Sequence, residues 1–196
     1  QELLHAIKVI GFKTLTPIQQ EAIPAARRGI DLLATAQTGT GKTAAYSLPV
    51  LQQMLEKPKH TEAGFARTLI LAPTRELVEQ IAAAMQQFAQ FTPYKIATVY
   101  GGVKLTGQSA KLRAGVDILV ATPGRLKEHV ELGNINLAKT EFVVLDEADR
   151  MMDMGFVNDM HGILTSIVRK HQTLFFSATS SPLVTNLAKQ AMNRPT

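Results

Sequence analysis

Cysteine and tryptophan are both absent from the 196 residues of the sequence, and aromatic residues make up only 6% of it. Without cysteine, disulfide bonds, thiolate metal sites and cysteine nucleophiles are excluded. Apolar runs stay well short of the roughly 20 residues that a membrane-spanning helix needs. The first residues also lack the charged, apolar and small-residue regions of an export signal. These absences favour a soluble protein of the cytoplasm that does not associate with membranes.

Acidic residues are fewer than basic residues in the sequence. Lysine and arginine number 21 and aspartate and glutamate 16, which gives a net charge of +5 and a pI near 9.6. This excess favours a polyanionic partner such as a nucleic acid, but it equally suits an ordinary soluble protein. The length fits one domain, since a fold of this size buries roughly 70% of its unfolded surface. The chain begins at Gln1 rather than methionine and ends in NRPT, so we expect a fragment of a longer protein.

Short apolar runs alternate with longer segments of helical periodicity. The runs are rich in Val, Ile, Leu and Phe, which is typical of strands buried on both faces of a parallel sheet. The predicted strands are residues 31–36, 68–73, 95–100, 117–122, 142–147 and 173–178. The predicted helices are residues 1–11, 17–29, 42–57, 74–91, 103–115, 124–133, 155–171 and 181–192, and residues 57–67 are predicted to form an exposed loop. We therefore expect an α/β fold with a mainly parallel sheet and helices on both faces.

The stretch ATAQTGTGKTAAY, residues 34–46, lies between a predicted strand and a predicted helix. Its centre matches the phosphate-loop pattern, with alanine at the first glycine position: Ala36, Gln37, Thr38, Gly39, Thr40, Gly41, Lys42 and Thr43. The glycines let successive backbone NH groups converge on phosphate oxygens, Lys42 adds a positive charge, and the Thr43 hydroxyl can ligate magnesium. The alternative is a flexible turn rich in glycine and threonine.

A phosphate loop needs an acidic residue at the end of a nearby strand to complete a metal site. The stretch FVVLDEAD supplies Asp146 directly after four apolar residues, so Asp146 is the predicted partner of Mg²⁺. Glu147 is the candidate for orienting and deprotonating the attacking water, because a carboxylate beside the metal is placed to act as a general base. Lys42, Asp146 and Glu147 are thus the predicted catalytic residues. Taken alone, the acidic cluster would suit a solvated helix N-terminus better.

At these residues the sequence resembles the DEAD-box ATP-dependent RNA helicases, whose name is spelled by residues 146–149. The family's motifs occur in order along the chain: GFKTLTPIQ at 11–19 (Q motif), AQTGTGKT at 36–43 (motif I), PTREL at 73–77 (motif Ia), a glycine pair at 101–102, TPGR at 122–125 (motif Ib), DEAD at 146–149 (motif II) and SAT at 177–179 (motif III). The resemblance implies a RecA-like P-loop NTPase domain, with residues 1–196 as the N-terminal domain of two. The stretch DEADRMMDMGF looks closest to the bacterial RhlE-like subgroup.

The resemblance implies that ATP binds together with Mg²⁺ and that the Q motif reads the adenine base. Phe12, Thr14 and Gln19 are the implied residues, and the Gln19 amide suits the donor and acceptor on the edge of adenine. Without the motif, Gln19 would be an exposed helix glutamine. The chain departs from the family at two points. Leu15 stands where the family often has proline, and the aromatic residue that stacks on adenine would precede Gln1.

Contacts with the RNA backbone are implied at three segments that each follow a predicted strand. The implied residues are Pro73, Thr74, Arg75, Gly101, Gly102, Thr122, Pro123, Gly124 and Arg125. Backbone contacts carry no sequence information, so binding should be largely independent of sequence, and recognition of the 2′-hydroxyl would separate RNA from DNA. The alternatives are an internal ion pair for Arg75 and a simple turn for the glycine pair.

The last motif is expected to connect the two sites. The resemblance places the strand before Ser177 and Thr179 beside the strand of the DEAD tetrad, so these hydroxyls could hydrogen-bond Asp149. The alternative is that both hydroxyls cap the next helix. The five histidines show no ligand spacing and are expected at the surface or in packing. Met151, Met152 and Met154 are expected to fill the core.

The implied function is that of half an enzyme. The family's second RecA-like domain, with its arginine finger and its part of the RNA clamp, lies beyond this chain, so the piece should bind ATP but hydrolyse it poorly. Expected partners are RNA, that second domain, and factors of ribosome assembly or RNA decay. The alternatives are a nucleotide-dependent RNA-binding module without turnover and a DNA-directed helicase or translocase.

Overall fold

The apolar runs of the sequence form a six-stranded sheet in the computed structural model, which describes residues 1–192. The strands are β1 (Leu32–Thr35), β2 (Ala66–Leu71), β3 (Ile96–Val99), β4 (Val116–Ala121), β5 (Phe142–Leu145) and β6 (Gln172–Ser177). They lie in the order β1-β6-β5-β2-β4-β3, and every neighbouring pair is parallel. The predicted strands and the predicted α/β fold are confirmed.

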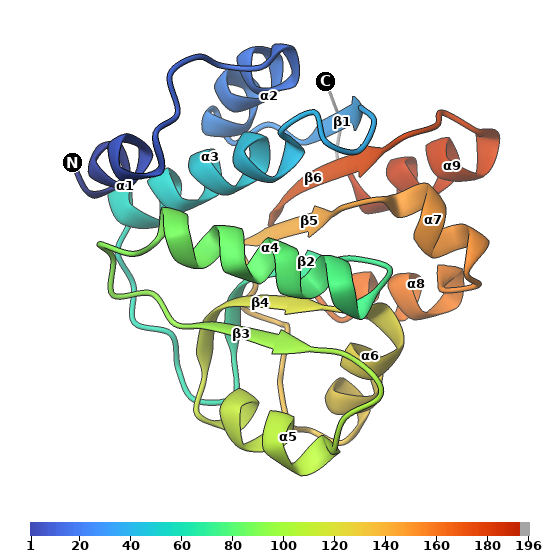
Figure 1. Cartoon of the computed structure of the whole chain (residues 1–196). Coiled ribbons are helices and arrows are strands. Elements are labelled where there is room, and N and C mark those ends of the chain that lie inside the picture. The colour runs from blue at the N-terminus through green and yellow to red at the C-terminus, as the bar shows by residue number, and fades with distance from the viewer. Residues whose placement is uncertain (193–196) are drawn as a thin grey trace.

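Helices cover both faces of the sheet (Figure 1). The helices are α1 (Glu2–Ile10), α2 (Pro17–Arg27), α3 (Lys42–Glu56), α4 (Arg75–Phe88), α5 (Leu105–Arg113), α6 (Pro123–Glu131), α7 (Ala148–Asp153), α8 (Val157–Thr165) and α9 (Pro182–Ala191). Side chains of α1 to α4 share one apolar core, and those of α5 to α9 share the other. Residues 1–192 contain no helix long and apolar enough to cross a lipid bilayer.

Each central strand feeds both cores because successive side chains point to opposite faces. In β2, Leu69 and Leu71 pack into the core of α5 to α9, while Ile70 packs into that of α1 to α4. In β6, Phe175 and Phe176 divide in the same way. Burial of each such side chain contributes about 1.5–3 kcal/mol, which explains why these strands are apolar throughout.

The parallel arrangement gives the sheet two different edges. The loops that follow the strands gather at one edge, which we call the carboxyl edge, and the loops that precede the strands gather at the opposite amino edge. The six motifs after the Q motif each follow a strand: 36–43 follows β1, 73–77 β2, 101–102 β3, 122–125 β4, 146–149 β5 and 177–179 β6. These motifs therefore all lie at the carboxyl edge, where ligands of open α/β sheets bind.

Two helix predictions were incomplete. The short α7 was not expected, because its residues were assigned to the acidic motif and to core methionines. The helix predicted over 155–171 ends at Thr165 instead. Residues 166–171 contain the β-branched pair Ile167 and Val168. The backbone NH groups of Ser166 and Ile167 close the last turn of α8 on the carbonyls of Ile163 and Leu164, and the chain then runs on into β6.

Three smaller expectations can also be checked. The predicted exposed loop 57–67 ends too late, because β2 begins at Ala66 and Arg67 is buried. Met151 is buried as expected, but Met154 is 47% exposed, so the prediction was wrong for that side chain. His129 is a packing residue, as expected: it is fully buried, and its ring nitrogens contact the amides of Gln108 and Asn134.

Candidate functional site

The loop between β1 and α3 folds as a cradle. Gly39 and Gly41 have φ angles of +79° and +88°, a region that glycine enters without the steric cost of a Cβ atom. The Thr40 hydroxyl donates to the Gln37 carbonyl at 2.8 Å and closes the turn. Helix α3 begins at Lys42, so its unpaired NH groups and the positive end of its dipole face the loop. This backbone form suits an anion such as a phosphate group.

Two flanking contacts hold the loop in place. The backbone NH of Ala36 donates to the carbonyl of Ser177 in β6 at 2.9 Å. On the other side, the Gln19 side chain accepts from the Thr16 backbone NH at 3.0 Å and donates to the Gly41 carbonyl at 3.1 Å. Gln19 is 5% exposed, so the alternative of an exposed helix glutamine was wrong. Its amide braces the loop, and its second NH and its second oxygen lone pair remain for contact with a base.

The rest of the Q motif lies on the surface before α2. Phe12 and Thr14 are both exposed, and the Phe12 ring lies 6.0 Å from the ring of Phe88 in α4. Leu15 is also exposed, at 53%. The exposed Phe12 and Thr14 side chains are therefore free of the core and open to a ligand.

Asp146 follows β5 and meets the cradle from the centre of the sheet. Its Oδ1 atom lies 3.4 Å from the Lys42 ammonium, and its Oδ2 atom accepts from the Tyr46 hydroxyl at 3.0 Å. All three side chains are buried. Neither Lys42 Nζ nor Asp146 Oδ1 has a hydrogen-bond partner, so the ion pair leaves bonding capacity that a bound polar ligand would satisfy.

Burial also changes the protonation equilibria at this point. It raises the pKa of Asp146 above its usual value, against the opposing charge of Lys42. Burial together with the charge of Asp146 raises the pKa of Tyr46 well above 10, so Tyr46 stays a neutral hydrogen-bond donor. A divalent cation would offset the cost of holding Asp146 ionised in this setting.

Glu147 has an unusual backbone. Its φ of 52° makes it the one non-glycine residue with positive φ in the described chain, residues 1–192. Such strain persists where the surrounding structure enforces it, and it is found frequently at functional sites. The turn starts α7 and holds the Glu147 carboxylate 3.3 Å from Arg150, with Glu147 8% exposed.

These groups line one cleft of about 370 Å³ at the carboxyl edge. The lining residues are Thr38, Gly39, Gly41, Lys42, Thr43, Leu77, Gln80, Asp146 and Glu147. The structure thus brings together the predicted phosphate loop and both predicted carboxylates. Leu77, Gln80 and the Tyr46 hydroxyl were not predicted, because only the folded chain brings them to the site.

The polar groups of the cleft include donors for a metal ion. Within residues 1–192, no group of three or more His, Cys, Asp or Glu side chains could hold a metal. The cleft instead offers one carboxylate oxygen without a partner, on Asp146, and the hydroxyl of Thr43. This set fits a hard cation such as Mg²⁺, which binds through few protein ligands and takes the rest from water and phosphate oxygens.

The predicted RNA contacts form a second group at the carboxyl edge, after the neighbouring strands β2, β4 and β3. Arg75 lies over the Tyr100 ring, 5.0 Å from its centre, and Arg125 donates to the Val103 carbonyl at 2.9 Å. The segment around the glycine pair is therefore in contact with both arginines. Each arginine also has a carboxylate partner: Glu79 lies 3.1 Å from Arg75, as the alternative for that residue foresaw, and Glu128 lies 3.0 Å from Arg125.

The residues of this second group differ in their exposure to solvent. Pro73, Thr122 and Pro123 are buried, so their side chains support the loops rather than face outward. The exposed or half-buried members are Thr74, Arg75, Gly101, Gly102, Gly124 and Arg125. Thr74 caps α4, since its hydroxyl accepts from the Leu77 backbone NH at 3.3 Å.

The third motif contacts the DEAD tetrad through the main chain. Asp149 accepts from the backbone NH of Ala178 at 3.1 Å, and the Ser177 hydroxyl accepts from the Thr179 backbone NH at 3.3 Å. The cap of α9 is a different residue, Ser181, so the capping alternative for Ser177 and Thr179 was wrong. Strand β6 lies between β1 and β5, which places the contact between Asp149 and Ala178 beside the cradle.

Comparison with known proteins agrees with this geometry. Residues 16–187 match the DEAD/DEAH box helicase family. The chain is 41% identical over 194 residues to "ATP-dependent RNA helicase DeaD" of Haemophilus influenzae, covering 98% of this chain and 31% of that protein. It is 43% identical over 195 residues to "ATP-dependent RNA helicase SrmB" of the same organism, covering 99% and 44%.

The fold is also found in a solved structure, that of a hypothetical ATP-dependent RNA helicase from Sulfolobus tokodaii. The TM-score is 0.90 at 35% identity, and the match covers 100% of this chain and 55% of the other. The chain spans less than half the length of the two curated relatives. With its RecA-like α/β fold and the motifs assembled at one edge of the sheet, the chain belongs to the DEAD/DEAH box helicase family.

Proposed function

We propose that this chain is the ATP-binding and RNA-binding half of an ATP-dependent RNA helicase. The observation that carries the proposal is the meeting of Lys42, Asp146 and Glu147 in one cleft at the N-terminus of α3. These residues come from distant parts of the chain and leave buried polar atoms without partners. The relatives that cover nearly all of the chain are named ATP-dependent RNA helicases.

Each group has a defined role in this proposal. The backbone NH groups of the 36–43 loop and the Lys42 ammonium bind the phosphates. Asp146 and the Thr43 hydroxyl hold Mg²⁺, which when bound neutralises charge on the phosphate oxygens. Glu147 orients the attacking water and accepts its proton. Gln19, which braces the loop at Gly41, and the exposed side chains of Phe12 and Thr14 would hold the base.

RNA would bind along the same edge of the sheet, over β2, β4 and β3. The exposed parts of the Ia, glycine-pair and Ib segments offer backbone NH groups and the guanidinium groups of Arg75 and Arg125 to phosphates. Asp149 of the DEAD tetrad accepts from the Ala178 backbone NH of the third motif at 3.1 Å, so a change at the phosphates would pass between the segments that follow β5 and β6.

The proposal includes a second RecA-like domain on the same polypeptide. Lys42 is the cationic side chain that lines the cleft. Stabilising the charge that develops on a transferring phosphoryl group requires more than one cationic side chain. In related NTPases an added arginine raises the rate by roughly 10³ to 10⁵. The RhlE-like subgroup, a cytoplasmic location, and partners in ribosome assembly or RNA decay belong to the same proposal and rest on the sequence motifs.

Nucleotide binding is tested by calorimetric titration of the chain with ATP and Mg²⁺. Lys42→Ala should weaken the affinity at least tenfold, because it removes a buried charge that faces the phosphates. Lys8→Ala, an exposed change on α1, serves as the matched control and should bind ATP as the unmodified chain does. Equal affinity in all three proteins would contradict the phosphate-loop assignment.

The choice among functions is tested by ATP hydrolysis in the complete protein with single-stranded RNA, single-stranded DNA of the same sequence, or neither. Stimulation by RNA alone is the expected result. Equal stimulation by DNA would favour a DNA-directed translocase. Tight RNA binding without any turnover would favour a nucleotide-dependent binding module.

A further inference from the structure

The amino edge of the sheet carries a continuous depression on the side of the molecule opposite the ATP cleft. Three cavities of about 410, 100 and 250 Å³ lie there. The first two share Arg67 and Glu141 as lining residues, and the last two share His60 and Thr61. We call the joined cavities the amino-edge trough. Its walls are the segments that precede the strands, from the end of α2 to the residues just before β3 and β4.

The positive charge of the protein is concentrated in this trough. Nine lysine and arginine side chains line it, against four aspartate and glutamate side chains. That excess of five equals the net charge of +5 of the whole sequence, with its 21 positive and 16 negative residues. The remaining sequence therefore holds 12 residues of each sign and is neutral overall.

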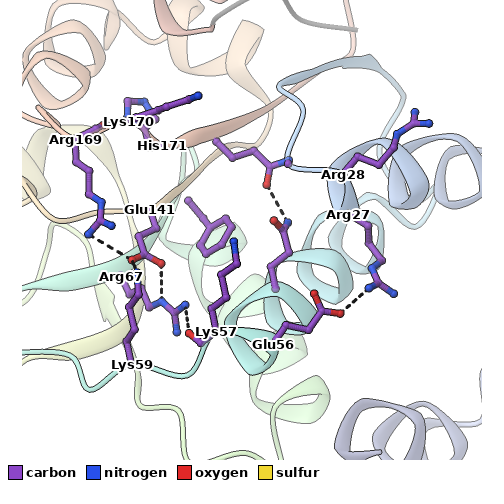
Figure 2. A pocket seen from close by; sticks show the side chains of 14 residues that line it. Arg27, Arg28, Glu56, Lys57, Lys59, Arg67, Glu141, Arg169, Lys170 and His171 are labelled. Carbon is purple, nitrogen blue, oxygen red and sulfur yellow. Dashed lines mark hydrogen bonds and ion pairs between the residues drawn. The ribbon is translucent and has the colours of Figure 1, made fainter.

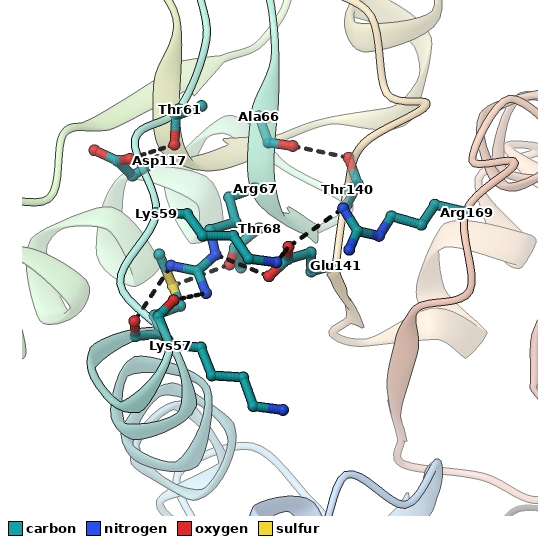
Figure 3. Close-up of polar contacts among 11 residues, drawn as sticks. Lys57, Lys59, Thr61, Ala66, Arg67, Thr68, Asp117, Thr140, Glu141 and Arg169 are labelled. Carbon is teal, nitrogen blue, oxygen red and sulfur yellow. Dashed lines mark hydrogen bonds and ion pairs between the residues drawn. The ribbon is translucent and has the colours of Figure 1, made fainter.

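Part of this charge has a structural explanation. Arg67 is 4% exposed, donates to Glu141 at 2.9 Å, and also donates to the carbonyls of Met54 and Lys57 at the end of α3 (Figure 3). Lys59 and Arg169 pair with the same Glu141. This cluster fixes the wall between the first two cavities, and its charges are used within the fold.

Four other cations have no such explanation. Among the ion pairs of residues 1–192, none involves Arg28, Lys57, Lys95 or Lys170, and all four are exposed. Figure 2 shows Lys57 reaching toward the middle of the first cavity, with Arg169 to His171 on one side of it and Arg27 and Arg28 on the other. Cations that converge without counterions favour a bound polyanion.

The shape of the trough favours an extended polyanion over a compact one. It follows the starts of six strands, and neighbouring strands lie about 4.8 Å apart, so the edge is about 24 Å long. This length accommodates several consecutive phosphates of one nucleic-acid strand.

We propose that the amino-edge trough is a second RNA-binding surface, which holds the phosphate backbone of single-stranded RNA independently of sequence. The choice of RNA rests on the proposed function, while the trough itself rests on its charge and shape. RNA held at both edges would pass around the sheet, so the trough would retain a second segment of a long RNA while the carboxyl edge acts on the first.

The test is fluorescence anisotropy of the chain with an unstructured labelled RNA of 20 nucleotides over a range of salt concentrations. The trough variant is Lys57→Gln with Lys170→Gln, and the control is Lys8→Gln with Lys189→Gln. All four lysines are exposed and absent from the ion pairs of the described chain. Each pair removes the same charge, so a difference between them reports position rather than net charge.

Two lost phosphate contacts should reduce the slope of log affinity against log salt by about 1.4, and weaken binding about 25-fold at 0.1 M salt. The control pair should leave both quantities close to those of the unmodified chain. Circular dichroism and urea unfolding verify that both variants are folded.

Equal behaviour of the two variants would overturn the proposal. A poly-glutamate peptide provides the competing arm: if the trough variant loses affinity for that peptide but not for RNA, the trough serves an acidic protein segment instead. ATP affinity of the unmodified chain is measured separately. If the unmodified chain does not bind ATP, the proposed function is contradicted, but the RNA-binding result for the trough still holds. Failure of the proposed function and failure of the trough proposal are therefore distinguishable.

Discussion

At the scale of single residues, the backbone at Glu147 separates the two carboxylates of the cleft. Asp146 remains in line with β5 and points at Lys42, whereas the positive φ of 52° turns Glu147 away toward Arg150. Two adjacent acids in a regular strand would point to opposite faces. The left-handed turn instead keeps both on the cleft.

Glu147→Gln should therefore keep ATP affinity and reduce turnover in the complete protein by roughly 10² to 10⁴, the usual contribution of a positioned general base. Steady-state hydrolysis and calorimetric titration of the same preparation provide the two numbers. Glu131→Gln, an exposed change at the end of α6, should alter neither. An unchanged rate for Glu147→Gln would remove this residue from the role of base.

Glu141 is a second acid whose environment makes a prediction. Burial raises its pKa, but hydrogen bonds from Lys59 and Arg67 outweigh burial and lower the pKa below its usual value of 4.5. Ionised Glu141 therefore stabilises the fold at pH above about 4.5, and this contribution is lost as the pH falls through the lowered pKa.

Glu141→Gln should lower the free energy of unfolding at pH 7 by about 1.5–3 kcal/mol, because it removes charge-assisted hydrogen bonds to the buried Arg67. The difference from the unmodified chain should shrink below pH 4.5. Glu62→Gln removes an ion pair with Lys139 in which Glu62 is 61% exposed, so it should cost less than about 1 kcal/mol. Urea unfolding at pH 7 and pH 4 measures both; equal losses in the two variants would argue against the role of Glu141.

At the scale of elements, strands were easier to predict than helix ends. The strands are buried on both faces, so their apolar runs carry a signal that needs no knowledge of neighbours. Helix α7 has only six residues and begins at a strained turn, which local patterns do not reveal. The residues after Thr165 have a composition that is compatible with a helix, but the helix ends there and β6 begins at Gln172.

The candidate site divides in the same way. The phosphate loop and the DEAD tetrad were predictable because each is a continuous stretch with its own chemistry. The bond from Tyr46 to Asp146 and the brace from Gln19 to Gly41 join residues 100 and 22 positions apart. The amino-edge trough is formed by the six segments that each precede one of the strands. Such contacts depend on the order of strands in the sheet, which no local pattern encodes.

The joint between α2 and the phosphate loop gives a prediction about elements. A Cβ atom on Gly41 would lie 2.5 Å from the Gln19 side-chain nitrogen, whereas one on Gly39 would meet nothing within 4 Å. Both glycines have positive φ, so both alanine substitutions share a backbone cost of about 1–2 kcal/mol. Gly41→Ala additionally pushes the two elements apart.

Gly41→Ala should therefore lose more stability in urea unfolding than Gly39→Ala, by about 1 kcal/mol, the value of the hydrogen bond that is displaced. When both glycine substitutions are repeated in a Gln19→Ala background, the difference between them should shrink, since the clashing amide is gone and only the Thr16 side chain, 3.1 Å from the added Cβ, remains. Equal losses from both glycine variants would show that Gln19 does not brace the loop.

At the scale of the whole molecule, the sheet keeps two kinds of chemistry apart. The family motifs after the Q motif occupy the carboxyl edge, and the excess positive charge occupies the amino edge. The longest strands have six residues, so the edges are about 20 Å apart. This distance exceeds the Debye length of roughly 8 Å at physiological salt, so exposed charges at one edge are largely screened from the other edge. We therefore expect charge at the trough to leave the electrostatics of the ATP cleft unchanged.

The chain alone has a cradle, a metal partner and a candidate base, but its cleft holds Lys42 as the cation for the phosphates. We expect the isolated chain to bind ATP and to hydrolyse it slowly, and the complete protein with a second RecA-like domain to turn over roughly 10³ to 10⁵ times faster in the presence of RNA. Hydrolysis by the two proteins at equal concentration and saturating ATP provides the ratio, and Lys42→Ala in the complete protein defines the background. Equal rates would mean that this chain already contains every group the reaction needs, because a missing cation is the physical reason for the difference.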